Sequence, residues 1–472
     1  MNTSTADISQ LIIETAQKAR SEVSGLPEPE LTTPVAWPVE CTVGPGLEGA
    51  IACETKVGYV NGSKGWLVYR GYDIFELCAH STYEEVSYLL LYGDMPTTRQ
   101  FETYNKKLID YRFLPHTLRH VMSFPMEDMN PMAAMRMGVN LMRQRQTDRD
   151  RGGHVRISKH KTIGTDEDSI PMEKVPRGTR KAIYEFSDNS VEAVAARKKQ
   201  VEKNDRRVHN LDACYHLISG TATIAAAISR LREHKLPIEP RADLSHAANL
   251  LYMMTGDVPT PEQARLMDVA LILHADHGMN ASTFATMVVA STLSDIYFSV
   301  GAGIAALNGP LHGGANEEVL KTLREIGDVE KVDKWYKKAR REKRKVMGFG
   351  HRVYKAYDPR ARILGPLAKK VVGESHDEEA KRLLKVAQRL EALVIADLGG
   401  KKGVFPNVDF YSGLVYAAMG IDSAMFTPLF AVSRVAGWTA RTIEYLKNNR
   451  IFRPRGVYVG GFDKSYVPMA ER

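Results

Sequence analysis

Residues 307–320 read LNGPLHGGANEEVL and place His312 between residues that interrupt regular structure. Glycine and proline before this histidine, and two glycines after it, argue against a helix or strand and predict a loop. The next residues have helical signals, with Asn316 as the cap and Gly327 as the stop. His312 therefore lies just before a helix N-terminus, whose partial positive charge favours a neutral imidazole that donates an N–H to an oxygen. A loop histidine satisfied by backbone groups is the competing interpretation.

Most of the remaining chain is helical in its sequence pattern. Residues 81–93 predict a helix that Ser81 caps and Gly93 stops, and a capping box begins at Thr260, with proline at the first helical position. The exception is residues 51–72, where apolar residues alternate around an Asn-Gly pair of the kind preferred in two-residue hairpin turns. The sequence predicts a mostly all-α fold with a small β-element near the N-terminus.

Length and composition are those of a globular protein. A chain of 472 residues exceeds one hydrophobic core, so two domains are expected, and its 44% apolar and 25% charged residues are ordinary for soluble folds. No run of about 18 apolar residues predicts a membrane span, and the apolar patch around Leu11 fits neither a signal nor a transit peptide. Four cysteines without C-x-x-C spacing indicate reduced thiols. We expect a cytoplasmic protein.

Residues 144–210 differ in character from the rest of the chain. They lack sustained periodicity, mix both charge signs and contain few large apolar residues. Residues 143–210 hold 17 Lys and Arg against 11 Asp and Glu, which accounts for most of the net charge of +8. We interpret the segment as a charged, solvated insertion. A nucleic-acid-binding arm is the alternative, which the scarcity of aromatic residues, only Tyr184 and Phe186, disfavours.

Two further stretches contain histidines suited to chemistry. LHADHGMNAST at 273–283 places His274 and His277 three residues apart, but a metal site there would need further ligands, and none are placed for it. We therefore expect no metal. GFGHRVYKAYDPRARIL at 348–364 places His351 directly after two glycines that allow the chain to approach a ligand closely.

An aspartate and several arginines complete the candidate site. Asp409 lies in FPNVDFYSG at 405–413, at the entrance to a helix, where an N-cap is the competing interpretation. Arg360, Arg434 and Arg453 offer guanidinium groups that can bind carboxylates with two parallel hydrogen bonds. This inventory suits an anionic substrate with several carboxylates.

Together these stretches resemble the citrate synthase family. The resemblance runs from WLVYRGYDIFEL at 66–77, through the stretches quoted above, to SRVAGW at 433–438, and it leaves out about the first 40 residues and the insertion. It implies a two-domain helical fold in which residues 1–312 form the large domain, 313–420 the small domain, and 421–472 a segment that returns to the large domain. It also implies a homodimer, or a higher homo-oligomer built from dimers, and a cleft that closes on oxaloacetate.

The resemblance also implies a reaction and its residues. It implies that acetyl-CoA condenses with oxaloacetate and that citryl-CoA is hydrolysed, with acetyl-CoA as a substrate and with no cofactor, nucleic acid or membrane as a partner. His312 matches the donor to the thioester oxygen, His351 the group beside the oxaloacetate carbonyl, and Asp409 the base that takes the methyl proton. The remaining matches are His277, Arg360, Arg434 and Arg453 for the substrate carboxylates, and Met347, Gly348, Phe349, Gly350, Lys355 and Lys401 for coenzyme A.

Elementary acid–base chemistry agrees with these implied roles. The methyl group of a thioester is a weaker acid than a carboxylic acid by more than ten pKa units, so moving its proton to a carboxylate costs on the order of 14 kcal/mol or more. Asp409 cannot do this alone. The enolate needs a fixed N–H donor such as His312 as it forms, and a hydrogen bond from His351 makes the ketone carbon electrophilic.

Two alternative functions remain open at this point. A 2-methylcitrate synthase would use the same chemistry with propionyl-CoA, and one methylene group gives only about 1–3 kcal/mol of discrimination. A non-catalytic protein that binds nucleic acid through the basic segment is the remote alternative. Such a protein would bind DNA with a steep salt dependence and would release no thiol from acetyl-CoA.

The composition of the insertion generates a prediction. Deleting about residues 150–205 and joining the ends with a short flexible linker should leave a folded, active enzyme. The segment lacks the apolar pattern of a core element, and the length of a flexible connection changes closure entropy only slowly. Thermal unfolding of the shortened and full chains measures this, and loss of cooperative unfolding in the shortened chain would contradict it.

Overall fold

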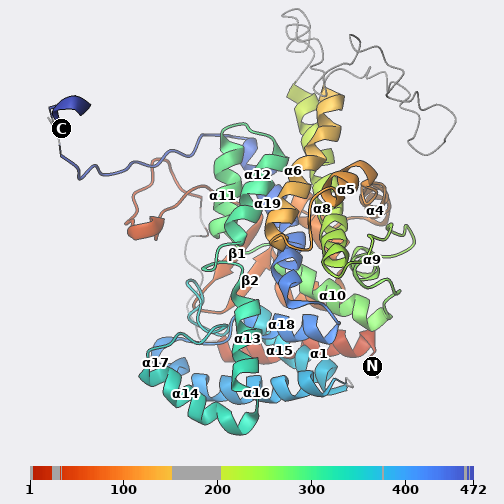
Figure 1. The fold of residues 1–472 in the computed structure, drawn as a ribbon, viewed down its shortest axis with the longest axis vertical. Coiled ribbons are helices and arrows are strands. Elements are labelled where there is room, and N and C mark those ends of the chain that lie inside the picture. Colours follow the sequence, from red (N-terminus) through yellow and green to blue (C-terminus); the bar gives the residue numbers. More distant parts are fainter. Residues whose placement is uncertain are drawn as a thin grey trace, which may run out of the picture.

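The computed structural model describes residues 4–23, 32, 34–150, 203–374, 377–461, 465–466 and 468–472. Within these ranges the chain is mainly helical, which confirms the predicted fold class (Figure 1). The first half contains α1 (Thr5–Val23), α2 (Ile74–His80), α3 (Tyr83–Tyr92), α4 (Thr98–Asp110), α5 (Pro115–Met122), α6 (Pro131–Asp150) and α8 (Lys203–Arg232). The second half contains α9 (His246–Thr255), α10 (Pro261–His274), α11 (Ala281–Ser291), α12 (Ile296–Leu307), α13 (Ala315–Ile326), α14 (Val332–Arg341), α15 (Pro359–Glu374), α16 (Glu378–Val394), α17 (Gly400–Lys402), α18 (Val408–Ala418) and α19 (Phe426–Leu446).

The β-element is a three-stranded antiparallel sheet in the order β1 (Gly58–Asn61), β2 (Trp66–Tyr69), β3 (Tyr72–Asp73). The predicted two-residue turn at Asn61 and Gly62 is wrong. Asn61 is the last residue of β1 and pairs with Trp66, so the loop spans residues 62–65. The Asn61 Oδ1 atom accepts hydrogen bonds from the Lys64 amide and the Ser63 hydroxyl, both at 2.8 Å, and these bonds stabilise the longer loop.

Helix caps follow the sequence closely, with one shift. The capping box from Thr260 to Gln263 is present, and Gly93 ends α3 with φ of 106°, as predicted. The cap of α3 is Thr82 rather than Ser81, because Thr82 forms the capping box with Glu85 while Ser81 closes the preceding helix.

The helices form two groups that meet at the candidate site. In the upper part of Figure 1, α19 lies in the centre and packs against α3, α8, α10, α11 and α12, and its residues 426–442 are all buried. In the lower part, α13, α15, α16 and α18 pack against one another, and α14 packs against α16. The lower group falls inside residues 313–420, the range predicted for the small domain, but these domain bounds stay a prediction.

Only the ends of the predicted 144–210 insertion are described. Residues 151–202 lie outside the described residues, whereas α6 continues to Asp150 and α8 begins at Lys203. The two ends of the predicted insertion are therefore helical, although their sequence lacks sustained periodicity, because adding residues to a helix that is already nucleated costs little. The remainder of the insertion stays a prediction. Within α8, Leu211–Arg232 is long and apolar enough to cross a membrane, but 89% of that apolar window is buried inside the protein, as in a core helix.

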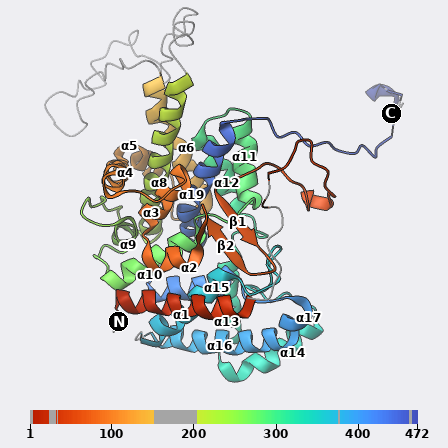
Figure 2. The same ribbon diagram turned by 180° about the vertical axis from the view of Figure 1, so that it is seen from behind.

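Helix α1 lies across both groups of helices (Figure 2). Its buried face holds Ile8, Ile12 and Ala16, and the helix packs against α2 and α10 as well as α15. The Ser9 hydroxyl donates to the Ala79 carbonyl of α2 at 2.8 Å. At its other end, Glu22 forms an ion pair with Arg362 of α15. The N-terminal helix thus links the lower helices to the upper ones.

Candidate active site

The His312 imidazole is held by the start of a neighbouring helix. Its Nε2 atom lies 3.2 Å from the Ser282 amide nitrogen and 2.8 Å from the Ser282 hydroxyl. This amide belongs to the first turn of α11, where N–H groups have no partner within the helix. An amide N–H can only donate, so Nε2 accepts and the ring proton sits on Nδ1. Burial, followed by the charge of Arg434, lowers the pKa of His312 to about 4.

The predicted cap of the helix after His312 is wrong. Gly314 occupies the N-cap position of α13 and makes no side-chain cap, whereas Asn316 is fully buried in the first turn. The chain therefore enters α13 two residues earlier than the sequence indicated, and His312 lies even closer to the helix start.

His351 is held neutral in the opposite tautomer. Its Nδ1 atom accepts hydrogen bonds from the amides of Val353 at 3.0 Å and Tyr354 at 3.2 Å. The ring proton is therefore on Nε2. Burial, followed by the charge of Arg360, lowers the pKa of His351 to about 4. At neutral pH this side chain presents one N–H in a fixed direction.

His277 lies beside His351 in a cluster of rings. The two imidazole centroids are 5.1 Å apart, and the Tyr354 ring is 4.9 Å from His351 and 5.3 Å from His277. The Nε2 atom of His277 lies 3.1 Å from the Tyr354 hydroxyl. Burial, with Arg360 as the next cause, holds the pKa of His277 well below its ordinary value. The structure therefore brings two of the predicted histidines together and adds Tyr354, which the sequence analysis missed.

The neighbouring His274 has a structural role instead. Its ring is fully buried, and its Nδ1 atom lies 2.7 Å from the Ala270 carbonyl, one helical turn earlier. The described part of the chain contains no group of three or more His, Cys, Asp or Glu side chains arranged to hold a metal ion.

Arg434 is a buried cation for which the described ranges supply no counter-ion. Its Nε group donates to the His274 carbonyl, and its guanidinium lies 4.6 Å from the centre of the Phe430 ring. Among the described residues, no carboxylate pairs with Arg434, and its buried Nη2 atom has no hydrogen-bond partner. Burial lowers the pKa of Arg434 to about 10. Because an isolated buried charge is costly, this guanidinium indicates a site for an anion.

Two other buried arginines already have carboxylate partners. Arg360 bonds both oxygens of Asp358, at 3.0 and 2.7 Å. Arg441 bonds both oxygens of Asp276, at 2.7 Å each. The sequence analysis predicted Arg360 but missed Arg441, although Arg441 follows Arg434 by seven residues and so lies on the same face of α19.

Arg453 does not reach this site within its own chain. It is exposed in the extended segment after α19, which leaves the body of the molecule toward the C-terminus (Figure 1). Phe452 anchors the start of this segment by stacking on Tyr445, with ring centroids 4.8 Å apart.

Asp409 is a buried carboxylate left free of a capping role. The cap of α18 is Asn407, whose Oδ1 atom accepts from the Asp409 amide at 3.1 Å, so the alternative that Asp409 is itself the cap is wrong. The Oδ1 atom of Asp409 is buried and has no hydrogen-bond partner within the described ranges. Burial raises the pKa of Asp409 to about 7, and the charges of Arg360 and Arg434 offset only part of this rise.

The predicted coenzyme A loop is built partly for packing. Residues 347–350 lie antiparallel to 404–407, joined by a bond of 2.8 Å from the Gly350 amide to the Phe405 carbonyl. Gly348 has φ of +80°, and a Cβ atom on it would lie 2.6 Å from a Val319 methyl group. This glycine therefore serves close packing as well as backbone flexibility.

Of the side chains predicted along this loop, only the lysines are open to solvent. Phe349 is buried against the Phe410 ring, with centroids 4.5 Å apart, and Met347 packs partly buried against the same core. Lys355 and Lys401 are both exposed. Their loops adjoin, because a Cβ atom on Gly403 would lie 2.7 Å from the Lys355 carbonyl oxygen.

The site as a whole inverts the ordinary order of side-chain acidity. The pKa of Asp409 is raised to about 7, while the pKa values of His312 and His351 are lowered to about 4. At neutral pH the site offers a partly ionised carboxyl group as a base and two neutral N–H donors, with Arg434 acting on His312 and Arg360 acting on His351. This set can remove a proton next to a carbonyl group and stabilise the oxyanion that forms.

Comparison of the sequence with known proteins identifies the family to which this site belongs. A family profile described as citrate synthase, C-terminal domain, matches residues 46–177 and 160–455. The citrate synthase of Deinococcus radiodurans is 38% identical over 430 residues, which cover 91% of this chain and 99% of the relative. The citrate synthase of Synechocystis sp. is also 38% identical, over 433 residues that cover 90% of this chain and 93% of the relative.

Solved structures agree with the sequence relatives. Citrate synthase from Pyrobaculum aerophilum superposes with a TM-score of 0.76 at 38% identity, covering 94% of this chain and all of the other. Citrate synthase from Thermoplasma acidophilum, solved as a ternary complex with carboxymethyl coenzyme A and oxaloacetate, superposes with a TM-score of 0.72 at 32% identity, covering 89% and 97%. The helical fold, the ordered motifs and these relatives lead to one conclusion: the chain belongs to the citrate synthase family.

Proposed function

We propose that this site condenses acetyl-CoA with oxaloacetate and hydrolyses the resulting citryl-CoA to citrate and coenzyme A, with Asp409 as the base. The observation that carries the proposal is the buried Asp409 carboxyl group, whose Oδ1 atom has no hydrogen-bond partner among the described residues and which feels the charge of Arg434. The same site contains His312 and His351, and backbone amides fix the tautomer of each ring. Curated relatives from bacteria carry the name citrate synthase, which supports the same reaction.

The first step forms the nucleophile. Asp409 takes a proton from the acetyl methyl group, and the carbon keeps the electron pair as an enolate. The Nδ1–H of His312 donates to the thioester oxygen as negative charge develops there. A neutral imidazole suits this role because the hydrogen bond from its N–H strengthens as negative charge develops on the oxygen. The imidazole also keeps its proton throughout this step.

The second step joins the two substrates. The methyl carbon attacks the ketone carbon of oxaloacetate with its electron pair, and the electron pair of the C=O double bond moves to the ketone oxygen. The Nε2–H of His351 donates a hydrogen bond to this alkoxide, which takes up one proton from water, while Asp409 returns the methyl proton to solvent and His351 keeps its own. Water then cleaves the thioester bond of citryl-CoA, and coenzyme A leaves as the thiol. Arg434, Arg360 and His277 hold the substrate carboxylates, with Arg434 supplying a charge that no carboxylate in the described part of the chain balances.

Coenzyme A is assigned to the surface next to this site. The backbone of residues 347–350 is placed beside the adenine end of the coenzyme, and the exposed cations Lys355 and Lys401 face its phosphates. The adjoining positions of these two lysine loops support this assignment. No bound cofactor is needed, because acetyl-CoA is consumed as a substrate.

We assign acetyl-CoA rather than propionyl-CoA as the acyl donor. The names of the curated relatives favour citrate synthase over 2-methylcitrate synthase. We expect kcat/KM with oxaloacetate to be higher for acetyl-CoA than for propionyl-CoA by about 10-fold or more, since one methylene group is worth about 1–3 kcal/mol. Thiol release measured with both acyl-CoAs tests this, and a preference for propionyl-CoA would reverse the assignment.

We also propose a cytoplasmic location and a homodimer. Cys78 and Cys214 are buried cysteines that form no disulfide, which fits a reducing compartment. The segment after α19 exposes large apolar side chains, with Val457 at 90% and Val459 at 92% exposure. A second copy of the chain would cover them, and the same segment would carry Arg453 into the partner's active site.

The inverted pKa values predict an acid limb in the activity profile. Asp409 must be ionised to act as a base, so kcat/KM should fall as the pH drops through about 7, where burial places its pKa. The histidines, with pKa values near 4, contribute no limb in this range. Thiol release from acetyl-CoA measured between about pH 5.5 and 9 gives the profile.

Two variants test whether Asp409, and no other titrating group, causes the acid limb of the pH profile. Asp409→Asn should lower kcat by several orders of magnitude and remove the limb from any residual activity, while oxaloacetate still binds. Asp328→Asn changes a half-exposed aspartate paired with Lys331 and should keep the wild-type profile. Near-normal turnover in Asp409→Asn would contradict the assignment.

The proposed crossing of Arg453 can be tested with mixed dimers. Asp409→Asn and Arg453→Ala are each expected to be inactive, and the two are refolded together. A two-fold dimer shares contacts reciprocally, so one site of a mixed dimer receives both defects and the other receives an intact Asp409 and an intact Arg453. Random mixing gives mixed dimers in half of the population, so activity should recover to about a quarter of wild type. If Arg453 serves its own chain, mixing restores nothing.

A further inference from the structure

Glu391 binds two tyrosines that flank the catalytic groups. Both of its oxygens accept hydrogen bonds, one from the Tyr357 hydroxyl and the other from the Tyr411 hydroxyl. Tyr357 directly precedes Asp358, the partner of Arg360, and Tyr411 follows Asp409 by two residues. One carboxylate on α16 therefore joins the start of α15 to the start of α18.

Tyr411 lies on the side of α18 that faces away from Asp409. Residues two apart on a helix point about 200° away from each other, so Tyr411 faces away from the side of α18 that carries Asp409. The Tyr411 ring lies against α15, where a Cβ atom on Gly365 would be 3.1 Å from its edge. Burial and the Glu391 charge raise the pKa values of both tyrosines, so both remain hydrogen-bond donors at neutral pH.

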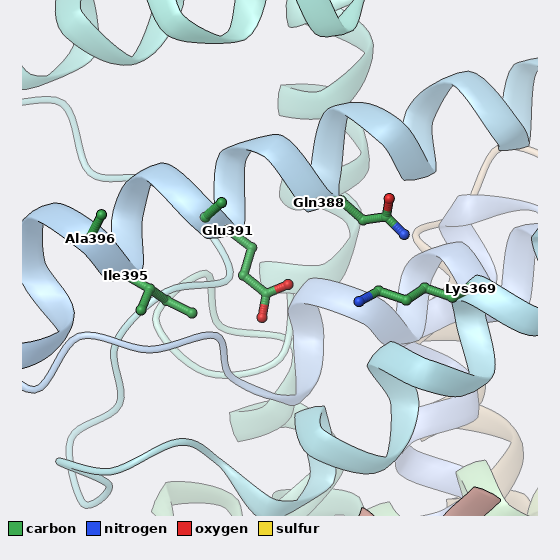
Figure 3. A pocket seen from close by; sticks show the side chains of 6 residues that line it. Lys369, Gln388, Glu391, Ile395 and Ala396 are labelled. Atoms are coloured by element: carbon green, nitrogen blue, oxygen red, sulfur yellow. The ribbon is translucent and has the colours of Figure 1, made fainter.

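Glu391 is also open to solvent on one side. It lines a pocket of about 490 Å³ between α15, which contributes Lys369, and the end of α16 with the turn after it, which contribute Gln388, Ala392, Ile395 and Ala396 (Figure 3). None of the residues proposed for catalysis lines this pocket. The backbone widens into a π-turn over Ile395–Gly399, one turn after Glu391, a feature frequent at functional sites.

We propose that Glu391 is a positioning residue that fixes Asp409 relative to the Arg360–Asp358 pair. Hydrogen bonds to a carboxylate are about twice as strong as neutral ones, and two of them on one group tie two helix starts to a third helix. The proposal rests on the proposed function, in which Asp409 is the base and Arg360 a substrate-binding group.

The position of Asp409 relative to Arg360 and Asp358 can be measured through the pKa of Asp409, which depends on these charges. Arg360 and Arg434 lower its pKa, Asp358 raises it, and Tyr416 is the further titratable group that feels its charge. Glu391 is not among the groups that act on Asp409 directly. If the tie to Tyr357 and Tyr411 loosens, Arg360 moves away and the pKa of Asp409 rises. Direct loss of a nearby negative charge would lower it instead, so the direction of the shift separates positioning from electrostatics.

Glu391→Gln tests the proposal with little change of shape. Glutamine keeps one acceptor oxygen but turns an N–H toward the other tyrosine, whose hydroxyl must then accept, so both charge-assisted bonds are replaced by weaker neutral ones. We expect kcat to fall on the order of ten- to a hundredfold and the acid limb of kcat/KM to move to higher pH. Glu378→Gln, the same change at an exposed position of α16, should leave both unchanged. Tyr357→Phe and Tyr411→Phe keep both rings and should each reproduce part of the effect.

The pocket allows a rescue experiment that a general structural role would not pass. In Glu391→Ala, added acetate or formate can enter from the pocket and supply a carboxylate between the tyrosines, so kcat should rise with its concentration. Acetamide, which has no charge, and chloride at equal ionic strength should not rescue. Wild-type kcat and an unmoved limb in Glu391→Gln, or equal rescue by acetamide, would overturn the proposal.

A spectroscopic readout separates this proposal from the proposed function. The carboxyl infrared band that Asp409→Asn removes reports the titration of Asp409 without any turnover. A shift of this titration to higher pH in Glu391→Gln supports positioning even if the protein releases no thiol from acetyl-CoA. An unchanged titration overturns positioning even if the wild-type protein is an active citrate synthase.

Discussion

The rest of the site depends on a buried arginine, Arg434, that no carboxylate among the described residues pairs with. Arg434 lies within the central helix α19, and its charge reaches the groups proposed for chemistry in three ways. It lowers the pKa values of His312 and His277 further than burial alone, so both remain neutral. It opposes the effect of burial on Asp409, which keeps part of that carboxyl ionised at neutral pH. It also leaves an unmet demand for negative charge that a substrate carboxylate can fill.

Backbone amides complete what the buried charge begins. His312 accepts at Nε2 from the α11 helix start, while His351 accepts at Nδ1 from the loop that follows it. Each contact fixes both the tautomer and the ring direction, because an amide N–H cannot reverse its role. Two histidines can therefore donate to two different oxygens without exchanging a proton with solvent. Side-chain partners alone would have left this choice open, since a hydroxyl can either donate or accept and a carboxyl gains a donor when it is protonated.

Local sequence signals predicted the elements better than the contacts between them. The loop at His312 was predictable because glycine and proline act on their own backbone. The cap at Asn316 was wrong because Gly314 begins the helix, and neighbouring residues with similar capping ability cannot be ranked without the path of the chain. Arg441 was missed because its partner Asp276 is 165 positions away in the sequence. The hydrogen bonds of Glu391 could not be predicted for the same reason, since three helices must pack together before its two oxygens reach the hydroxyls of Tyr357 and Tyr411.

The raised pKa of Asp409 links catalysis to stability. A rise from 3.8 to about 7 strengthens the base by about 3 pKa units, or on the order of 4 kcal/mol of the roughly 14 kcal/mol that proton removal requires. The hydrogen bond from His312 must supply much of the remainder. The same shift contributes stability that is complete below the unfolded pKa near 4 and is lost as the pH rises through about 7. His312 and His351 act in the opposite sense, because their lowered pKa values favour the folded state above about 6.5 and this contribution is lost as the pH falls toward 4. The fold therefore tolerates a site whose groups oppose one another, and its stability has to come from the buried helices around α19.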